Sequence, residues 1–572
     1  MSGREALRRS TREKDYVGST KLAVATDSQD QVIRAMRMSI TQAMKDKGME
    51  PHTVKAIAAE IENLLEMKAG PLVRYEDIPH QYRGEIVNAF MFLVDKFKAK
   101  GEFEKRKGRM VSGKTTKVFE ETSSPSVNPI TVMTMLHEAA ALDYEIAAYD
   151  FRGAFLGTPI DKAKDGRIFI RIPKDVTKFW VLLHPEAAEF VDLKGHMYME
   201  LDKYLYGLPP SGSRFHEFVK KIFTQEGATI SSADKCALVI KSKVKPGEVI
   251  KISMHVDDLL MTFPTLKDRK YIEAVIRRHF EITTQYDDIT YLGIFIKRNR
   301  AQRTVHIDQE GFTRKLVETF GGSDLKPAST PAKADLFECD PASPKMSKPQ
   351  VFVSLIMSLM YLARLTRCEI LLPTVFLSTK CSSPTEQDYH KARHILRYLK
   401  GTPKRGITLG GKGPDVMKPR FIVDTSHGVH MDGKGQLGLI IMLGIAVIFC
   451  RSCKLKAVTL SSTESEVYGL SDSVGYALWF ARLLNDFGYS DVCPMETWQD
   501  NQSAMHMQTT GSGRFSRSKH IFIRDCFVKE HIDNGEIVLK YVPTEDMLAD
   551  MLTKPLDKAA FNRLVKRMFT DA

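Results

Sequence analysis

Two adjacent acidic residues, Asp257 and Asp258, lie in the middle of residues 252–262, between apolar and β-prone stretches. Successive strand residues point to opposite faces, so these carboxylates converge only if the chain turns sharply between two strands. The sequence therefore predicts a β-hairpin with an acidic tip. Carboxylate oxygens bind Mg²⁺, and paired ions can stabilise the attacking and leaving oxygens of a phosphoryl transfer. Because most Asp-Asp pairs between strands are solvated turns, the pair alone does not establish catalysis.

A third acid, Asp150, lies upstream in a comparable position. It ends the apolar segment 144–150 and is followed by small and aromatic residues, including Ala154 and Phe155. A third acid in such a matching context raises the chance that the Asp257-Asp258 pair is catalytic.

Another set of acids lies in the last third of the chain. Asp424 ends a short apolar strand, Asp500 closes another apolar-flanked segment, and Asp550 is expected in a helix opened by Pro543 and Thr544. Acids on helices are usually solvated, so Asp550 has a surface position as its alternative. Together with Glu466, these acids are expected to lie on a strand, a helix, a strand and a helix in chain order.

Glu466 is the remaining member of this second set. Residues 461–464, Ser-Ser-Thr-Glu, have the spacing of a capping box, which predicts a helix start and assigns Glu464 to the cap. Glu466 instead shares a helix face with Leu470 and Val474, the side that packs onto the sheet. An unpaired acid on a buried face is costly, and metal binding is one way to meet that cost.

These motifs, in this order, resemble the reverse transcriptase and ribonuclease H region of Pol polyproteins from copia-type LTR retrotransposons. The segments that resemble the polymerase are Asp150 with Ala154-Phe155, Leu205-Tyr206-Gly207-Leu208, His255-Val256-Asp257-Asp258 and Tyr291-Leu292-Gly293. Those that resemble the ribonuclease H are residues 460–466, 500–504, 519–521 and 548–555. The resemblance covers roughly residue 45 to the end of the chain.

The resemblance implies an α+β fold class: a right-hand polymerase with fingers, palm and thumb or connection, followed by an α/β ribonuclease H-like domain. The expected domains are a flexible lead-in over residues 1–45, fingers and palm over 46–270, a helix-rich thumb or connection over 271–415, and the ribonuclease H-like domain with a C-terminal helix over 416–572. Residues 410–414, Gly-Gly-Lys-Gly-Pro, are expected to be the linker before the last domain.

The resemblance also implies the cofactor and the site residues. Each site is expected to hold two Mg²⁺ ions, with Mn²⁺ as a substitute. The catalytic and metal-binding residues implied are Asp150, Asp257 and Asp258 in the polymerase, and Asp424, Glu466, Asp500 and Asp550 in the ribonuclease H. Lys107 and Arg109 are candidates for binding the incoming triphosphate, and Phe155 for packing under its sugar. His520 is a candidate substrate contact. The alternatives are a solvated basic loop, a core phenylalanine and a structural histidine.

The amino-acid composition indicates which kinds of binding partner and cellular compartment suit this protein. The 572 residues carry a formal net charge of +13, which is compatible with a polyanion, although solvated lysine faces also make proteins basic. The longest uncharged run, residues 437–450, has 14 residues and is too short to span a bilayer. Eight scattered cysteines are typical of a reducing compartment, and the amino terminus lacks the apolar stretch of a secretory signal. We expect an intracellular protein without a membrane partner.

The resemblance then names the partners: an RNA template, a DNA primer, the RNA–DNA hybrid, deoxynucleoside triphosphates, and the integrase and capsid proteins of the same element. It implies a cytoplasmic, particle-associated location, with entry into the nucleus as an option. The expected function is RNA-directed DNA polymerase with attached ribonuclease H. The alternatives are a catalytically decayed or recruited nucleic-acid-binding protein, which Pro209-Pro210 would favour, and a particle-assembly scaffold.

Three helices are expected from apolar spacing outside these motifs. One starts near Pro51, with its apolar residues at helical spacing: Val54, Ile57, Ala58, Ile61, Leu64 and Leu65. A second covers residues 84–97. A third covers residues 390–401, with its apolar side inward and its lysines and arginines in solvent, where they can face a duplex backbone.

Overall fold

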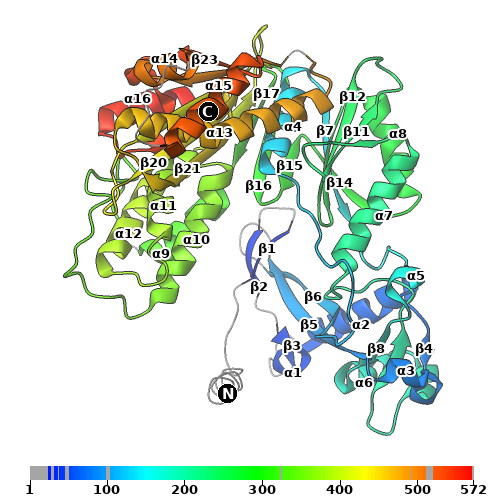
Figure 1. The fold of residues 1–572 in the computed structure, drawn as a ribbon. Coiled ribbons are helices and arrows are strands. Elements are labelled where there is room, and N and C mark those ends of the chain that lie inside the picture. Colours follow the sequence, from blue (N-terminus) through cyan, green and yellow to red (C-terminus); the bar gives the residue numbers. More distant parts are fainter. Residues whose placement is uncertain are drawn as a thin grey trace, which may run out of the picture. The chain divides into compact units, whose positions relative to one another are not determined.

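The structure is a computed structural model of the 572-residue chain, shown in Figure 1. It describes residues 23–27, 31–35, 38–44, 50–97, 103–322, 325–490, 492–510 and 519–569. Most of the expected lead-in therefore lies outside the described residues. The chain forms two compact units: unit 1 comprises Met1–Ser123 and Gly153–Arg214, and unit 2 comprises Ser124–Arg152 and Phe215–Ala572. The domain boundaries drawn from the sequence stay predictions.

Unit 1 is built on a sheet with the strand order β3-β5-β8-β9-β4, and β6 pairs with β5 outside that path. The strands are β3 (Met38–Ser39), β4 (Leu72–Val73), β5 (Val87–Phe97), β6 (Phe103–Ser112), β8 (Phe169–Ile172) and β9 (Met197–Glu200). Helix α2 (Glu50–Glu66) packs against β6 and buries Ile57, Ile61 and Leu64, so the helix expected from Pro51 onward is confirmed. Val54 and Leu65, which belong to the same expected stripe, are exposed.

The helix expected over residues 84–97 is wrong, because this segment forms strand β5. Val87, Ala89, Met91 and Leu93 are all buried at alternate positions, which is the period of a strand with one face on the core. The same apolar residues also fit a helical face over a short window, and the aromatic neighbours at alternating positions favour the strand.

Unit 2 contains the palm-type sheet, a six-stranded sheet with the order β10-β11-β12-β13-β7-β14. Its strands are β7 (Glu145–Phe151), β10 (Thr229–Ile230), β11 (Ala237–Lys241), β12 (Val249–His255), β13 (Asp258–Phe263) and β14 (Ile282–Tyr286). Helices α4 (Pro129–Ala141) and α8 (Leu266–Arg277) both contact β13. Twelve of the thirteen residues of α4 are buried, so this helix is a central part of the core.

The chain between the palm-type sheet and the last sheet mixes strands with helices. Strands β15 (Asp288–Tyr291), β16 (Ile294–Asn299), β17 (Thr304–Asp308) and β18 (Ile407–Gly410) form one antiparallel sheet. The helices are α9 (Glu310–Gly321), α10 (Pro349–Leu365), α11 (Leu371–Ser378) and α12 (Glu386–Gly401). The helix-rich character expected over residues 271–415 is correct for residues 310–401 and misses these four strands and β14 of the palm-type sheet.

The last sheet has the order β21-β20-β19-β22-β23. Strands β19 (Pro419–Ser426), β20 (Lys434–Leu443) and β21 (Ala446–Val458) are antiparallel neighbours, whereas β22 (Met495–Gln499) and β23 (Ile537–Tyr541) run parallel to β19. Helix α13 (Ser462–Asp486) packs on β19. This mixed order is that of a ribonuclease H-like fold, so the predicted fold class, polymerase palm plus ribonuclease H-like domain, is confirmed.

The expected linker at residues 410–414 is held by a buried histidine of α4. Gly410 N–H donates to His137 Nδ1 at 3.0 Å, and His137 Nε2 donates to Val416 O at 2.8 Å. Burial lowers the pKa of His137 to about 4, which keeps the ring neutral and able to accept from Gly410. The segment is therefore anchored to unit 2, and no division between the two compact units falls there.

No helix in the described part of the chain combines the length and the apolar character that crossing a bilayer requires.

Candidate active sites

The first candidate site lies where three strands of the palm-type sheet meet. Strands β12 and β13 form a hairpin in which His255 pairs with Asp258, so the two-residue turn is Val256-Asp257. The predicted hairpin is confirmed, but its tip lies one residue earlier than the Asp257-Asp258 pair. Val256 adopts a φ of 55°, a left-handed conformation that strains a β-branched residue. Strain of this kind is concentrated at functional sites.

Asp150 lies directly across from Asp258, because β7 and β13 pair in antiparallel register at these two residues. Side chains of directly opposed residues lie on the same face, with Cβ atoms about 5 Å apart. Burial, together with the carboxylates of Asp257 and Asp150, raises the pKa of Asp258 to about 7. The three predicted acids are therefore brought together, and their mutual repulsion would be relieved by a divalent cation.

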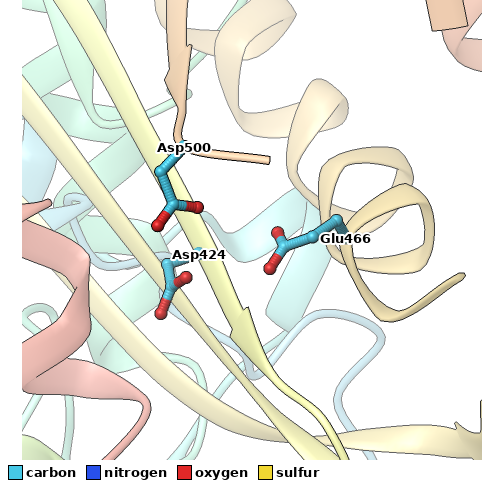
Figure 2. A group of neighbouring side chains, drawn as sticks. All are labelled: Asp424, Glu466 and Asp500. Carbon is cyan, nitrogen blue, oxygen red and sulfur yellow. The ribbon is translucent and has the colours of Figure 1, made fainter. Parts of the chain in front are cut away.

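The second candidate site is a tighter cluster in the ribonuclease H-like sheet. Asp424 lies on the central strand β19, Glu466 on the first turns of α13, and Asp500 directly after β22. Ligand oxygens of these three residues all lie within 4.8 Å of one another, and Figure 2 shows the carboxylates converging. Within the described part of the chain, it is the one group of three or more acidic, cysteine or histidine residues whose ligand atoms lie this close together.

Asp550 completes the second site from the C-terminal side. It lies in the 3₁₀ helix η6 (Leu548–Leu552), which contacts β19 and β20, so the single helix expected from Pro543 onward is wrong. A separate 3₁₀ turn, η5 (Thr544–Asp546), comes first. Lys554 Nζ contacts Asp550 Oδ1 at 2.7 Å. Burial and the charge of Asp550 raise the pKa of Asp424 to about 7, so the two carboxylates lie close together.

Hydrogen bonds hold the acids of the second site in place. Glu466 accepts from Thr425 N–H at 3.2 Å and from Gln499 Nε2 at 3.1 Å. Thr553 Oγ1 donates to Asp424, and Thr544 Oγ1 donates to Asp500 at 2.8 Å. Sequence analysis missed these donors. Thr553 and Lys554 follow Asp550 in the 548–555 motif, so that motif could have indicated that both residues contact acids of this site.

Burial dominates the electrostatics of this site. Glu466 is only 4% exposed, and burial, followed by the charge of Asp424, raises its pKa well above the ordinary value. Several buried carboxylates with raised pKa values and a common focus are typical of a divalent-metal site, because a cation removes the cost of keeping them ionised together.

Gly469 allows helix α13 to approach β19 closely enough to place Glu466 beside Asp424. A Cβ at this position would lie 2.3 Å from Thr425 Cγ2. We expect Gly469→Ala to destabilise the protein by about 1–3 kcal/mol and to reduce cleavage at the second site, because the helix must move away from the strand. Chemical denaturation checks the stability. Gly475→Ala on the same helix, where a Cβ meets nothing within 4 Å, serves as the control and should be neutral or stabilising. Equal losses for both variants would contradict this account.

All three predicted nucleotide-binding residues, Lys107, Arg109 and Phe155, belong to unit 1. Lys107 and Arg109 lie on β6, two positions apart and so on the same face. Burial raises the pKa of Glu60 on α2 to about 7, and the charges of Lys107 and Arg109 both act against that rise, which places the two cations near Glu60.

Tyr206 connects Arg109 to Phe155. The Arg109 guanidinium lies 4.9 Å from the centre of the Tyr206 ring, and the buried Phe155 ring packs edge-on against Tyr206 at 4.7 Å between centroids. Gly207, with a φ of 87°, lets this segment approach β6, since a Cβ there would lie 2.7 Å from Ser112 O. Sequence analysis identified the 205–208 motif but did not give Tyr206 this role.

The remaining predicted positions are less informative. His520 is exposed on the first turn of α15 (Lys519–Asp533), and residues 511–518 before it lie outside the described part. Pro209 and Pro210 precede helix α7 (Ser211–Gln225), and Pro210 O accepts from Arg214 N–H at 2.9 Å. Proline is tolerated at a helix start, because the first N–H groups have no partner within the helix.

A palm-type sheet with three clustered acids and a ribonuclease H-like sheet with four define the class of this protein: a polymerase-type module joined to a ribonuclease H-like module. Comparison with known proteins agrees with that class. No family model matches the chain. The curated relatives are retrovirus-related Pol polyproteins of plant transposons, which confirms the resemblance to copia-type Pol polyproteins drawn from the sequence.

Three such relatives have similar scores. The Pol polyprotein from transposon RE2 of Arabidopsis thaliana is 26% identical over 489 residues, which cover 84% of this chain and 32% of the relative. That from transposon TNT 1-94 of Nicotiana tabacum is 26% identical over 456 residues, with coverages of 77% and 32%. That from RE1 of Arabidopsis thaliana is 27% identical over 495 residues, with coverages of 84% and 32%. The chain spans about a third of the length of these relatives.

Solved structures similar to the chain include two foamy viral protease-reverse transcriptase complexes with double-stranded DNA. Their TM-scores are 0.48 and 0.46, both at 13% identity, covering 86% of this chain and 69% and 83% of theirs. Ribonuclease H1 from Halobacterium salinarum covers 24% of this chain and 93% of its own, with 16% identity and a TM-score of 0.18. The fold assignment rests on the strand order and register described above.

Proposed function

We propose that this chain is an RNA-directed DNA polymerase with an attached ribonuclease H, both using divalent cations for phosphoryl transfer. The observation that carries the proposal is the register of the palm-type sheet, which sets Asp150 opposite Asp258 beside the strained Val256-Asp257 turn. The cluster of Asp424, Glu466 and Asp500 supports the second activity. Homology to Pol polyproteins supports both.

The residues of each site fit a divalent cation. In the first site, Asp150, Asp257 and Asp258 would hold the ions, and in the second Asp424, Glu466, Asp500 and Asp550. Bound Mg²⁺ would lower the pKa of the primer 3′-hydroxyl or of the hydrolytic water and neutralise charge on the phosphates. Mn²⁺ has the same preference for oxygen ligands and would substitute.

The protein's own contribution is to fix the carboxylates. In the first site the two-residue turn and the paired register hold Asp257, Asp258 and Asp150 at one edge of the sheet. In the second, Thr425 N–H and Gln499 Nε2 orient Glu466, while Thr553 and Thr544 orient Asp424 and Asp500. Donors that hold the ligands in this way usually change metal affinity or activity strongly when they are removed.

The proposed substrates follow from this chemistry. They are an RNA template, a DNA primer and deoxynucleoside triphosphates at the first site, and an RNA–DNA hybrid at the second. The net charge of +13 favours binding of all these polyanions. Intracellular work alongside the integrase and capsid proteins of the same element is part of the proposal.

The test uses the purified full chain with an RNA template annealed to a labelled DNA primer. With Mg²⁺ and deoxynucleotides the primer should be extended, and a preformed RNA–DNA hybrid should lose its RNA strand. A chelator should stop both reactions, and Mn²⁺ should restore them. Salt-sensitive hybrid binding without extension or cleavage would identify a non-catalytic binder instead and reject the proposal.

Within this function, Tyr206 is expected to support the triphosphate end of the nucleotide site. Tyr206→Leu removes the ring that Arg109 and Phe155 share, which should raise the KM for deoxynucleotides about tenfold with a smaller change in kcat. Tyr206→Phe keeps the ring and should stay within about twofold of the wild type. Steady-state primer extension measures both constants. If the two variants behave alike, the ring contacts do not contribute to nucleotide binding.

A further inference from the structure

A cavity of about 550 Å³ lies in unit 2 between helix α12 and the residues that follow α9. Its floor is apolar and includes the buried side chains of Leu325, Ala332 and Leu336. One wall is the face of α12 that carries Lys391, Arg393, His394 and Arg397, all half-buried, and the exposed Lys326 and Lys333 lie at its rim. The cavity is remote in sequence from all seven proposed catalytic acids.

The charge on this lining is unbalanced. Five cationic side chains, those of Lys326, Lys333, Lys391, Arg393 and Arg397, line the cavity together with a single carboxylate, Asp335. Among the described residues none of the five has an ion pair with an acid, although ion pairs are frequent elsewhere in unit 2. Like charges gathered in one cavity repel one another, so the arrangement favours a bound anion.

Hydrogen bonds to backbone carbonyls keep the cations of α12 at the cavity wall. Lys391 Nζ donates to Leu336 O at 3.0 Å, Arg397 Nε donates to Lys326 O at 2.9 Å, and Arg393 Nη2 donates to Gly321 O at 3.1 Å. These three residues, expected to be solvated, are half-buried, whereas Lys400 of the same face is exposed as expected. Carbonyl partners position a cation without neutralising it, so the full positive charge stays available.

The cavity wall also carries a hydrogen-bond donor that has no partner among the described residues. Arg393 Nε is buried and has no hydrogen-bond partner in the described part of the chain. Each guanidinium offers five N–H donors in a planar fork that matches phosphate oxygens, and Lys391 adds an ammonium group. An apolar floor, cationic walls and lysines at the mouth suit a compact anion with several charges better than an isolated carboxylate.

We propose that this cavity is a binding site for a phosphate-bearing anion, with a short polyphosphate as the best-matched ligand. The phosphate could belong to a free polyphosphate or to a nucleic-acid backbone, and both sources present the same oxygens. None of the seven proposed catalytic acids lines the cavity, so binding there can be measured without either proposed activity.

The test measures binding of inorganic tripolyphosphate to the full chain by isothermal titration calorimetry, at low ionic strength and with EDTA present. Wild-type protein should bind saturably. The double variant Lys326→Glu/Lys333→Glu changes two exposed rim residues, so it should fold normally, and it should bind about tenfold more weakly or worse. The control Lys267→Glu/Lys270→Glu makes the same change in net charge on exposed residues of α8 and should stay within about twofold.

Two further experiments identify the source of the phosphate and test whether the proposed nucleotide site accounts for the binding. Arg109→Ala should keep tripolyphosphate binding, because Arg109 belongs to the proposed nucleotide site in unit 1. Displacement of tripolyphosphate by a short DNA duplex identifies backbone phosphate as the source, and no displacement identifies free polyphosphate. The proposal is overturned if the wild type shows no saturable binding, if the rim and control pairs weaken binding equally, or if the loss occurs with Arg109→Ala instead.

Discussion

Asp258→Asn is expected to lower primer extension by a factor of about 10³ or more while leaving cleavage of an RNA–DNA hybrid unchanged. The substitution keeps the shape of the side chain and removes one of the charges that face each other across β7 and β13. Burial raises the pKa of Asp258 to about 7, and the charges of Asp257 and Asp150 add to that rise. An amide cannot supply the anionic oxygen that a divalent cation prefers.

The measurement is single-turnover extension of an RNA-templated primer, with hybrid cleavage assayed on the same preparation. Asp288→Asn is a matched control, because Asp288 is exposed on β15 in the same unit, and it should extend the primer normally. Because the two clusters use separate residues, each assay serves as the folding control for the other. Extension by Asp258→Asn at the wild-type rate would remove these acids from the proposed site.

Asp424→Asn is expected to abolish hybrid cleavage, by about 10³-fold or more, and at the same time to stabilise the metal-free protein at pH 8 by about 2 kcal/mol. Asp424 is 4% exposed, and burial together with Asp550 raises its pKa to about 7. Without a cation, an ionised carboxylate at this position opposes folding. Asparagine removes that charge and keeps the volume.

The pH dependence follows from the raised pKa. In the folded, metal-free protein Asp424 binds a proton up to about pH 7, whereas in the unfolded chain it does so only below its ordinary value of 3.8. The folded state therefore binds more protons between these values, and the stability contributed by Asp424 is complete below 3.8 and is lost as pH rises towards 7. His137 acts in the opposite direction, because its pKa is lowered to about 4, so the comparison is made between variant and wild type at each pH.

Urea denaturation in EDTA at pH 5 and pH 8 checks this. The stability difference between Asp424→Asn and wild type should be small at pH 5 and large at pH 8. Added Mg²⁺ should stabilise the wild type and not the variant, as expected for a ligand that binds only the folded site. Asp415→Asn, at an exposed position of the same segment of chain, should show neither effect. A destabilised Asp424→Asn at pH 8 would indicate that the carboxylate is stabilised by its hydrogen bonds and is no metal ligand.

Local patterns indicated several of the acids, because Asp150 and Asp424 end apolar segments and Glu466 follows a capping box, whereas the grouping into two sites came from the family resemblance. Alternation and capping patterns involve only residues close together in the chain, so they can be recognised without knowledge of the fold. Glu466 was separated from Glu464 on this basis, and the structure agrees, since Glu464 caps the backbone of Leu460 at 2.8 Å.

The structural features that could not be predicted from the sequence depend on contacts between residues far apart in the chain. The turn at Val256 requires a conformation that valine rarely adopts, so propensity points one residue too far along. The short 3₁₀ turns around Asp550 are set by packing on β20, and the carbonyl partners of the α12 cations come from a segment more than fifty residues earlier. Strand β5 was mistaken for a helix because a short apolar run fits both periods.

The histidine that anchors residues 410–416 also affects how the molecule can be divided. Helix α4 lies before the palm acids in sequence, yet it packs on β18 and β21, and one continuous apolar core extends from Val127 to Phe569. The two modules are therefore not independent folding units, and a fragment starting at residue 416 would lose both His137 hydrogen bonds and the cover of α4. The palm-type sheet and the ribonuclease H-like sheet share this core, so we expect them to unfold together, and a substitution that destabilises one sheet should destabilise the other.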